Sequence, residues 1–274
     1  MVKRKFSGIP LGDEAPAVIT GVINIAPETF YKESSVQNPQ KAADRAEKMI
    51  EDGADIIDLG AMSTAPGVEP ISLEEEKQRL LPVLEKVSER IDAPISIDTQ
   101  RAEVAKIALE SGGQMINDVS GFKYDSRMPS VVTDFDCPAV LMAAKQEPGD
   151  ARKIEEVKQV LQESLDICDR EGVDLEKIVI DPGIGFGKGT KWDLHILKNL
   201  HELKKLNHPV CVGISRKSFI GEVLDLKDPA DRLWGSLGAT AIAVMNGADM
   251  IRTHDPKETI HVVRVVEAIR GKVD

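Results

Sequence analysis

Short, almost wholly apolar runs alternate along the chain with longer stretches in which apolar residues recur every three or four positions. Apolar runs such as KIVI (177–180) and PVCVGI (209–214) are typical of parallel strands covered on both faces. The longer stretches, at 38–53, 72–90, 150–172 and 191–206, are typical of amphipathic helices. The apolar runs predict eight strands, at 19–25, 55–61, 93–99, 114–120, 138–143, 177–183, 209–215 and 249–255.

Eight strand and helix units in 274 residues predict an α/β protein with a single-domain (β/α)8 TIM barrel, a fold that usually takes roughly 250 residues. We expect residues 1–18 to form an N-terminal extension leading into the barrel, and residues 19–274 to form the barrel itself. A doubly wound open sheet is the alternative, and it would usually carry a dinucleotide or phosphate fingerprint.

The glycine-rich stretch DPGIGFGKG (181–189) does not supply such a fingerprint. Its spacing is one residue too short for a P-loop, and Gly189 stands where that motif has Ser or Thr. Lys188 occupies the position of the third glycine in a Rossmann motif. What remains is Asp181 at the end of a buried strand, followed by a loop that can turn sharply and approach a ligand closely.

Composition narrows the partners and the compartment. The formal net charge of −11 disfavours a broad nucleic-acid surface, although a local basic pocket for a small anion stays compatible with it. Cys137, Cys168 and Cys211 are odd in number and far apart, which indicates neither a disulfide framework nor a zinc site and fits a reducing cytoplasm. No apolar run approaches the roughly 18 residues of a membrane span, so we expect no membrane segment.

Polar residues gather where the predicted strands end, which is the face of a TIM barrel that carries the chemistry. Each of them alone is typical of a capping or turn residue. Because six strands end in this way, their joint occurrence predicts a functional site. These residues are Asn24, Asp98, Asn117, Asp118, Asp181, Ser215, Arg216, Lys217, Ser218, Arg252 and His254.

The set divides by charge. The carboxylates and amide of Asp98, Asn117 and Asp181 suit a flat heterocycle with neighbouring N–H donors, because one carboxylate accepts two parallel hydrogen bonds. A second group without carboxylates offers donors that suit phosphate oxygens, and Lys217 fits either group. The residues therefore predict a planar, nitrogen-rich ring that bears a phosphate group. The donor group consists of Asn24, Arg252 and His254.

Ordered motifs along nearly the whole chain resemble the dihydropteroate synthase family. The SRKSF and R-x-H pieces favour this family over other pterin-binding barrels. The resemblance implies condensation of 6-hydroxymethyl-7,8-dihydropterin diphosphate with 4-aminobenzoate, with release of pyrophosphate. The motifs are GVINIAPETF (21–30), GADIIDLGAMSTAPG (53–67), SIDT (96–99), IND (116–118), DPGIGFGK (181–188), SRKSFIG (215–221) and RTHD (252–255).

The resemblance also implies roles for the strand-end residues. Asp98, Asn117, Asp181 and Lys217 match the pterin site, and Phe186 lies beside them. Asp98, Lys217 and Asp181 are the implied catalytic residues. In the implied mechanism, diphosphate leaves first, the acidic pocket holds the resulting pterin-methyl cation, and the arylamine nitrogen then attacks.

Further positions match the sites of the other groups. Asn24, Arg252 and His254 match the diphosphate site, and Asn24 is also implied as a ligand of Mg²⁺. The family is commonly homodimeric, and residues 233–248 are either its interface helix or an ordinary buried helix. The implied arylamine-binding residues are Phe30, Thr64, Pro66 and Ser218.

The sequence departs from the family pattern near the second substrate. Ala65 replaces an arginine of the second loop, Ala26 and Glu28 replace Thr and Asp in the first, and LMAAKQEPG (141–149) replaces the usual segment after the fifth strand. One hypothesis is a larger arylamine, the ribosyl phosphate derivative used in methanopterin synthesis; the alternative is drift at a variable loop. A pterin-dependent corrinoid methyltransferase and a non-catalytic pterin-binding barrel are further alternatives.

Two other expectations concern single residues. Lys188 is either a solvated loop residue or part of the site. Trp192 and Trp234, on predicted helices, are expected to be packing residues rather than stacking platforms.

Overall fold

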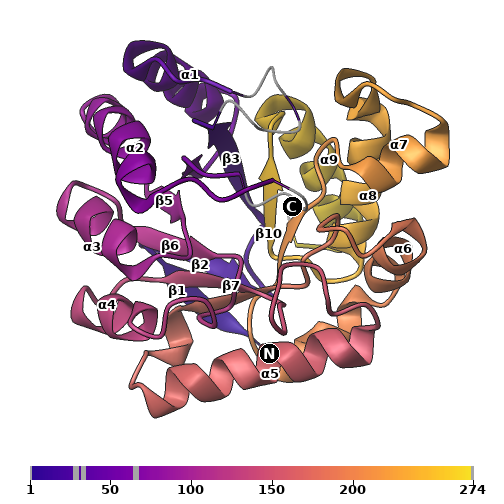
Figure 1. The fold of residues 1–274 in the computed structure, drawn as a ribbon. Coiled ribbons are helices and arrows are strands. Elements are labelled where there is room, and N and C mark those ends of the chain that lie inside the picture. Colours follow the sequence, from indigo (N-terminus) through magenta and orange to yellow (C-terminus); the bar gives the residue numbers. More distant parts are fainter. Residues whose placement is uncertain (1, 27–30, 32–34, 64–67, 273–274) are drawn as a thin grey trace.

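The computed structural model describes residues 2–26, 31, 35–63 and 68–272. Within this part of the chain, eight parallel strands follow the order β8-β7-β6-β5-β4-β3-β10-β9 around a barrel (Figure 1). A parallel bridge between Ile180 and Val210 joins the two ends of this order. The predicted (β/α)8 barrel is therefore confirmed. The strands are β3 (Val18–Asn24), β4 (Ile56–Gly60), β5 (Ile95–Asp98), β6 (Met115–Asp118), β7 (Ala139–Met142), β8 (Ile178–Asp181), β9 (Cys211–Gly213) and β10 (Met250–Thr253).

Helices surround the barrel and cover its outer face (Figure 1). In the described residues no helix combines the length and the apolar character needed to cross a membrane. The helices are α1 (Pro39–Glu51), α2 (Leu73–Ser88), α3 (Ala102–Glu110), α4 (Met128–Asp134), α5 (Ile154–Arg170), α6 (Thr190–Lys198), α7 (Ser218–Leu224), α8 (Leu233–Met245) and α9 (Pro256–Ile269).

Local side chains explain where several helices begin and end. Asn38 accepts a hydrogen bond from the Lys41 amide (3.0 Å) and caps α1, just before a proline at its first position. Ser72 caps α2 by accepting from the Glu75 amide (3.1 Å). The predicted helix at 191–206 is divided: α6 ends at Lys198, and a 3-10 helix follows at Leu200–Leu206.

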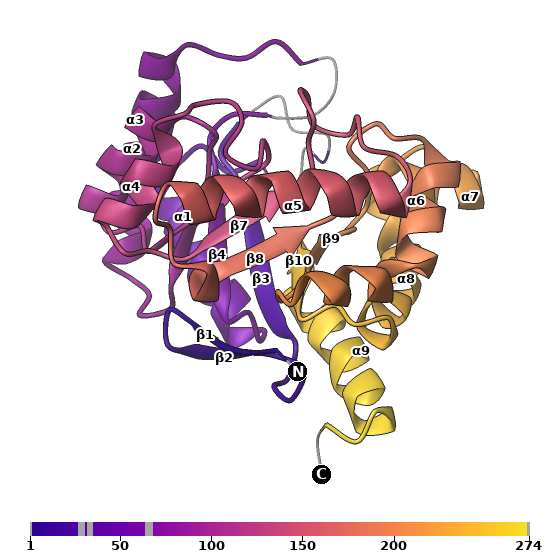
Figure 2. The same cartoon turned by 90° about the horizontal axis from the view of Figure 1, so that it is seen from below.

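The first residues form a small hairpin that the sequence analysis described only as an extension. β1 (Lys3–Phe6) pairs antiparallel with β2 (Ile9–Gly12), and both lie at the end of the barrel where β3 begins (Figure 2). Phe6 and Leu11, each 1% exposed, pack against inward-facing residues of the barrel strands. The hairpin therefore closes one end of the barrel with apolar side chains.

Side chains alternate between the two faces of each barrel strand. Outward residues such as Ile19, Ile57 and Ile97 pack in the cluster that contacts the helices. The first inward residues of seven barrel strands, together with two residues of the hairpin, form a separate apolar group, which we call the floor cluster. It consists of Phe6, Leu11, Val18, Ile56, Met115, Val140, Val179, Cys211 and Met250.

Two positions further along several of these strands, the inward residue is polar instead of apolar. Asp58 follows Ile56 in this way. On β6, β8 and β10 a polar residue likewise lies two positions after a residue of the floor cluster. Asp98 ends β5 and pairs in register with Asn117. We call these residues the polar layer: Asp58, Asp98, Asn117, Asp181 and Arg252.

The tryptophan prediction is wrong for one of the two residues. Trp234, on α8, has 78% of its surface exposed and so does not pack in the core. Trp192 is half-buried on α6, with the Lys191 ammonium 5.0 Å from the centre of its ring.

Candidate active site

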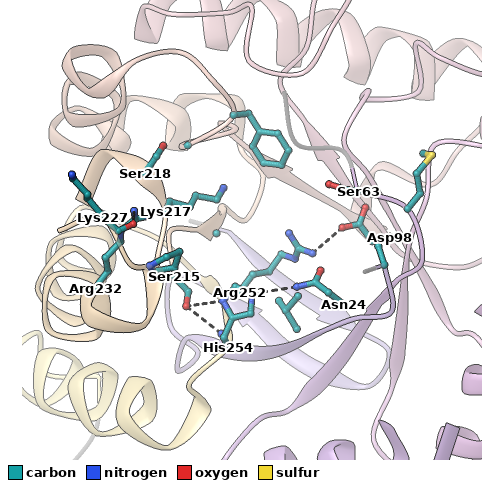
Figure 3. Close-up of a pocket in the computed structure, with 17 residues that line it drawn as sticks. Asn24, Ser63, Asp98, Ser215, Lys217, Ser218, Lys227, Arg232, Arg252 and His254 are labelled. Carbon is teal, nitrogen blue, oxygen red and sulfur yellow. Dashed lines mark hydrogen bonds and ion pairs between the residues drawn. The ribbon is translucent and has the colours of Figure 1, made fainter. Parts of the chain in front are cut away.

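A cavity of about 470 Å³ opens at the end of the barrel where the parallel strands finish (Figure 3). Its volume lies in the range of small-molecule sites, and its position is that of catalytic sites in TIM barrels. Eight of the predicted site residues line it: Asn24, Asp98, Phe186, Ser215, Lys217, Ser218, Arg252 and His254. The strands thus bring together side chains that are up to 230 residues apart in the sequence.

Arg252 reaches across the polar layer to two carboxylates. Its Nη2 donates to the carboxylate of Asp58 and to Oδ2 of Asp98 (3.0 Å), an arrangement visible in part in Figure 3. Asp58 is 1% exposed and comes from the middle of β4, and the sequence analysis did not select it. Arg252 was expected among phosphate-binding donors, so its place between two acids differs from the predicted division by charge.

Several buried polar atoms in this layer have no hydrogen-bond partner among the described residues. They include Oδ1 of Asp58, Oδ1 of Asp98 and Nδ2 of Asn117. Burying such atoms without partners costs free energy, so native proteins usually retain them for a reason. Because Asp98 and Asn117 pair in register, the free acceptor and the free donor lie on adjacent strands.

The charge state of Asp98 follows from its surroundings. Burial raises the pKa of its carboxyl to about 7; Arg252 opposes this shift and the nearby Asp58 adds to it. Asp98 is therefore a carboxyl group whose ionisation changes near neutral pH.

Asn117 and Asp181 lie deeper than the described lining of the cavity, with 3% and 6% of their surfaces exposed. Asp181 accepts a hydrogen bond from the Gly183 amide (2.6 Å). Burial raises the pKa of this carboxyl, and the Lys217 ammonium lowers it in opposition. Both predicted residues therefore belong to the interior side of the site.

Lys217 and Phe186 lie together over this interior. The Lys217 ammonium is 4.3 Å from the centre of the Phe186 ring and donates to the carbonyl of Ile184. Burial lowers the pKa of Lys217 to about 8, although Asp181 favours its charged form. Gly185, with a φ of 79°, leaves room for the lysine stem, because a Cβ there would lie 2.1 Å from Lys217 Cδ.

Lys188 helps to fix the glycine-rich loop, and its burial excludes the solvated position that was one of its two alternatives. Lys188 is 3% exposed and donates to the carbonyl of Ala151 (2.6 Å), in the loop after β7. Burial lowers its pKa to about 8, while Asp193 and Asp181 favour the ammonium. Asp193 also accepts from the Gly185 amide (2.8 Å), so both sides of the loop that carries Phe186 are held by buried side chains.

The donor side of the cavity centres on His254. Its Nε2 lies 3.4 Å from Asn24 Nδ2, and its Nδ1 lies 3.0 Å from Ser215 Oγ (Figure 3). Burial lowers the pKa of His254 to about 3, and Arg252, Arg45 and Arg216 add to this effect. The imidazole is therefore neutral at physiological pH in the protein alone.

The remaining predicted residues are divided between described and undescribed parts of the chain. Ser218 is exposed at the start of α7 and lines the cavity. Phe30, Thr64 and Pro66, and with them Ala65, lie outside the described residues. Arg216, in contrast, forms a two-point ion pair with Asp255 (2.9 and 2.7 Å), which gives it a structural role beneath the donor side.

The side chains around the cavity limit how the implied Mg²⁺ could be held. In the described ranges, no three or more His, Cys, Asp or Glu side chains are grouped so that they could hold a metal. Mg²⁺ usually keeps several waters and takes one or two protein oxygens together with substrate phosphates. The amide oxygen of Asn24, at the edge of the cavity, fits such a metal that arrives with a diphosphate.

Comparisons with known proteins agree with this geometry. The pterin binding enzyme family matches residues 20–254. A dihydropteroate synthase of Synechocystis sp. is 37% identical over 258 residues, which cover 92% of this chain and 89% of the relative. That of Escherichia coli K12 is 37% identical over 257 residues, 91% of this chain and 90% of the relative.

Solved structures give the same result. The structure of a Coxiella burnetii dihydropteroate synthase in complex with pteroic acid superposes with a TM-score of 0.88 at 34% identity, covering 98% of this chain and 99% of the other. A Yersinia pestis dihydropteroate synthase in a sulfonamide drug complex gives a TM-score of 0.91 at 31% identity, covering 99% and 100%.

Proposed function

The chain belongs to the pterin binding enzyme family as a dihydropteroate synthase, a transferase of folate biosynthesis, and from this premise we propose which of its residues perform the reaction. The substrates are 6-hydroxymethyl-7,8-dihydropterin diphosphate and 4-aminobenzoate. The relatives do not favour a corrinoid methyltransferase or the ribosyl phosphate substrate of methanopterin synthesis.

The pterin binds in the polar layer. The observation that carries this assignment is the pair of buried, unpartnered atoms on adjacent strands, Oδ1 of Asp98 and Nδ2 of Asn117. The amino-pyrimidinone edge of a pterin presents N–H donors beside acceptors, which complement a carboxylate next to an amide. Asp181 accepts further N–H groups, and Phe186 and Lys217 cover the ring.

The diphosphate binds on the donor side, at Asn24, Arg252 and His254. Arg252 lies beside Asp98, at the boundary between the pterin and the diphosphate. Mg²⁺, where bound, neutralises diphosphate charge and takes the Asn24 amide oxygen as one ligand. Neutral His254 donates one N–H to a phosphate oxygen, and an anion beside it would favour the imidazolium.

Catalysis follows from where charge develops. Departure of diphosphate leaves positive charge on the pterin and negative charge on the leaving group. Asp98 and Asp181 stabilise the first, and the donor side stabilises the second. Lys217 donates to the pterin, and Phe186 excludes water above it. No side chain needs to act as a nucleophile, because the arylamine nitrogen forms the new bond.

The arylamine binds at the outer rim of the cavity. Ser218 lies at the first position of α7, where backbone amides and a hydroxyl suit a carboxylate. Phe30, Thr64 and Pro66 complete this site in our proposal. In our proposal residues 19–274 form the catalytic barrel and residues 1–18 its N-terminal extension, with β3 starting one residue before this boundary, at Val18.

We further propose a cytoplasmic homodimer. Apolar side chains are exposed on α7, α8 and α9, and α8 packs against both of the other helices. An apolar face of this kind is typical of a protein–protein interface. The three cysteines are free and buried, as expected in a reducing compartment. The exposed residues are Val223, Leu224, Trp234, Ile242, Met245, Val265 and Ile269.

The test of the reaction is pyrophosphate release by the purified protein with the dihydropterin diphosphate and Mg²⁺. One sample receives 4-aminobenzoate and the other its ribosyl phosphate derivative. We expect rapid release with the first and slow release with the second. Preference for the second would overturn the substrate assignment, and silence in both would overturn the reaction.

A further inference from the structure

Asp58 is a buried carboxylate for which the proposed reaction has no use. It lies in the polar layer, is 1% exposed, and forms an ion pair with Arg252. Its second oxygen, Oδ1, has no partner among the described residues. Removing a carboxylate from water is unfavourable, so a buried one that neither contacts substrate nor satisfies the backbone needs an explanation.

The explanation lies in what happens to Arg252 when the pterin binds. In the protein alone, Arg252 Nη2 divides its hydrogen bonds between Asp58 and Asp98. Asp98 is the acceptor that the pterin edge requires, so the ring and the guanidinium compete for the same carboxylate. If Asp58 were absent, displacement from Asp98 by the pterin would leave Arg252 as a buried, unpaired charge, which is strongly unfavourable.

We propose that Asp58 is a positioning residue that retains Arg252 while the pterin takes its place at Asp98. This proposal rests on the pterin assignment made above. Asp58 is the partner that Arg252 keeps, so Asp98 is released at little electrostatic cost. The guanidinium also stays at the boundary between the pterin and the diphosphate, where it can donate to the leaving group.

The geometry supports an exchange rather than a fixed ion pair. Asp98, at the end of β5, pairs in register with Gly60 of β4. Asp58 lies two residues before Gly60 on β4, so its carboxylate comes from a deeper level of the barrel than that of Asp98. The deeper carboxylate is beyond the described lining of the cavity, whereas Asp98 and Arg252 line it. A ligand in the cavity therefore meets Asp98 and leaves Asp58 in contact with Arg252.

The test is a double-mutant cycle read by calorimetric binding of 6-hydroxymethylpterin, which lacks the diphosphate. The proteins are the wild type, Asp58→Asn, Arg252→Met and the double variant. We expect Asp58→Asn to weaken binding about tenfold, because Arg252 then depends on Asp98 alone. We expect the double variant to bind within about threefold of wild type, since it removes one charge of each sign and restores the balance.

The outcomes separate the possible roles of Asp58. Unchanged binding by Asp58→Asn would overturn the proposal. Equal weakening in the double variant would also overturn it, because Asp58 would then act on the pterin or on the fold directly. If Asp58→Asn does not fold, tighter binding by the double variant than by Arg252→Met supports the proposal, and equal binding contradicts it.

Two controls complete the design. Asp249→Asn removes a different buried carboxylate, which is paired with Lys204 at the base of β10 and lies away from the cavity, and it should leave pterin binding unchanged. Absence of pterin binding by the wild type would instead overturn the proposed function on which the inference rests.

Discussion

The floor cluster and the polar layer are built from the same strands, yet they serve different ends. On three strands a floor residue lies two positions before a polar-layer residue, so both face the inside of the barrel. These pairs are Met115 and Asn117, Val179 and Asp181, and Met250 and Arg252. The floor residues are apolar and packed against one another and the β1–β2 hairpin. The polar layer instead contains buried atoms without partners and carboxylates that share one arginine.

The difference shows how a barrel separates stability from chemistry. Burial of an aliphatic side chain stabilises the fold by about 1.5–3 kcal/mol, whereas burial of a charge opposes folding unless it is well paired. The polar layer therefore lowers the stability of the folded protein, because its polar groups are already in position before the ligand binds. Substitutions in the two layers should have opposite consequences.

The largest expected effect comes from the polar layer itself. Asp181→Asn should reduce kcat/KM about 1000-fold, because it removes the negative charge that stabilises the cationic pterin in the transition state. Thermal stability should remain equal or rise, since a buried carboxylate is replaced by a neutral amide. Initial rates and thermal unfolding measure the two quantities. A parallel loss of stability would place Asp181 among the structural residues instead.

The matching change in the floor cluster should act only on stability. Met250→Ala is expected to destabilise the protein by about 3 kcal/mol, through lost burial and the cavity that remains. Urea unfolding measures this loss, and kcat/KM per folded molecule should stay within about twofold of wild type. Impaired catalysis in a fully stable variant would show that the layers are not separable.

A pH series sharpens the comparison, because the floor cluster contains no carboxyl or amino group that could ionise. The pKa of Asp98 is raised to about 7 in the free protein, so the carboxylate predominates above that pH and the acid below it. Pterin N–H groups need the carboxylate, so affinity should fall about tenfold for each pH unit below this value. Calorimetry with 6-hydroxymethylpterin measures it, and Asp98→Asn should abolish the dependence. A flat profile in wild type would refute the assignment.

The smallest effect is expected at the support of the polar layer. Lys188→Met loses the hydrogen bond to Ala151 and should raise the KM for the dihydropterin diphosphate about tenfold, because the loop that carries Phe186 is less well fixed. Lys188→Arg should recover part of this loss. Lys191→Met, an exposed neighbour in the same segment, should match wild type in steady-state kinetics. If it is impaired as much as Lys188→Met, general disturbance of α6 explains both.

Much of the fold was predictable because apolar runs and helical periodicity are local signals. β3 begins one residue before its predicted range, and the other seven barrel strands lie inside theirs. The β1–β2 hairpin was missed because KRKF and IPLG are only four residues long, the first mainly basic and the second containing a proline and a glycine. The division of the helix at 191–206 was missed too, since the apolar pattern continues through the 3-10 segment.

The site was predictable where a polar residue ends a strand and less so elsewhere. Asp58 lies inside an apolar run, although the alternation Ile56, Asp58, Gly60 placed it on the inward face and was the available signal. Buried Lys188 donates a hydrogen bond to a carbonyl 37 residues earlier in the chain, and such a tertiary contact leaves no local pattern. The exposure of Trp234 depends in the same way on what packs around α8.

The most direct test of this account is a crystal structure with pteroic acid or 6-hydroxymethylpterin bound. We predict that the amino-pyrimidinone edge lies within hydrogen-bond distance of Oδ1 of Asp98 and Nδ2 of Asn117, with Arg252 still paired to Asp58. A ring bound elsewhere in the cavity, with these two atoms still lacking partners, would contradict the claim that the polar layer is the pterin site.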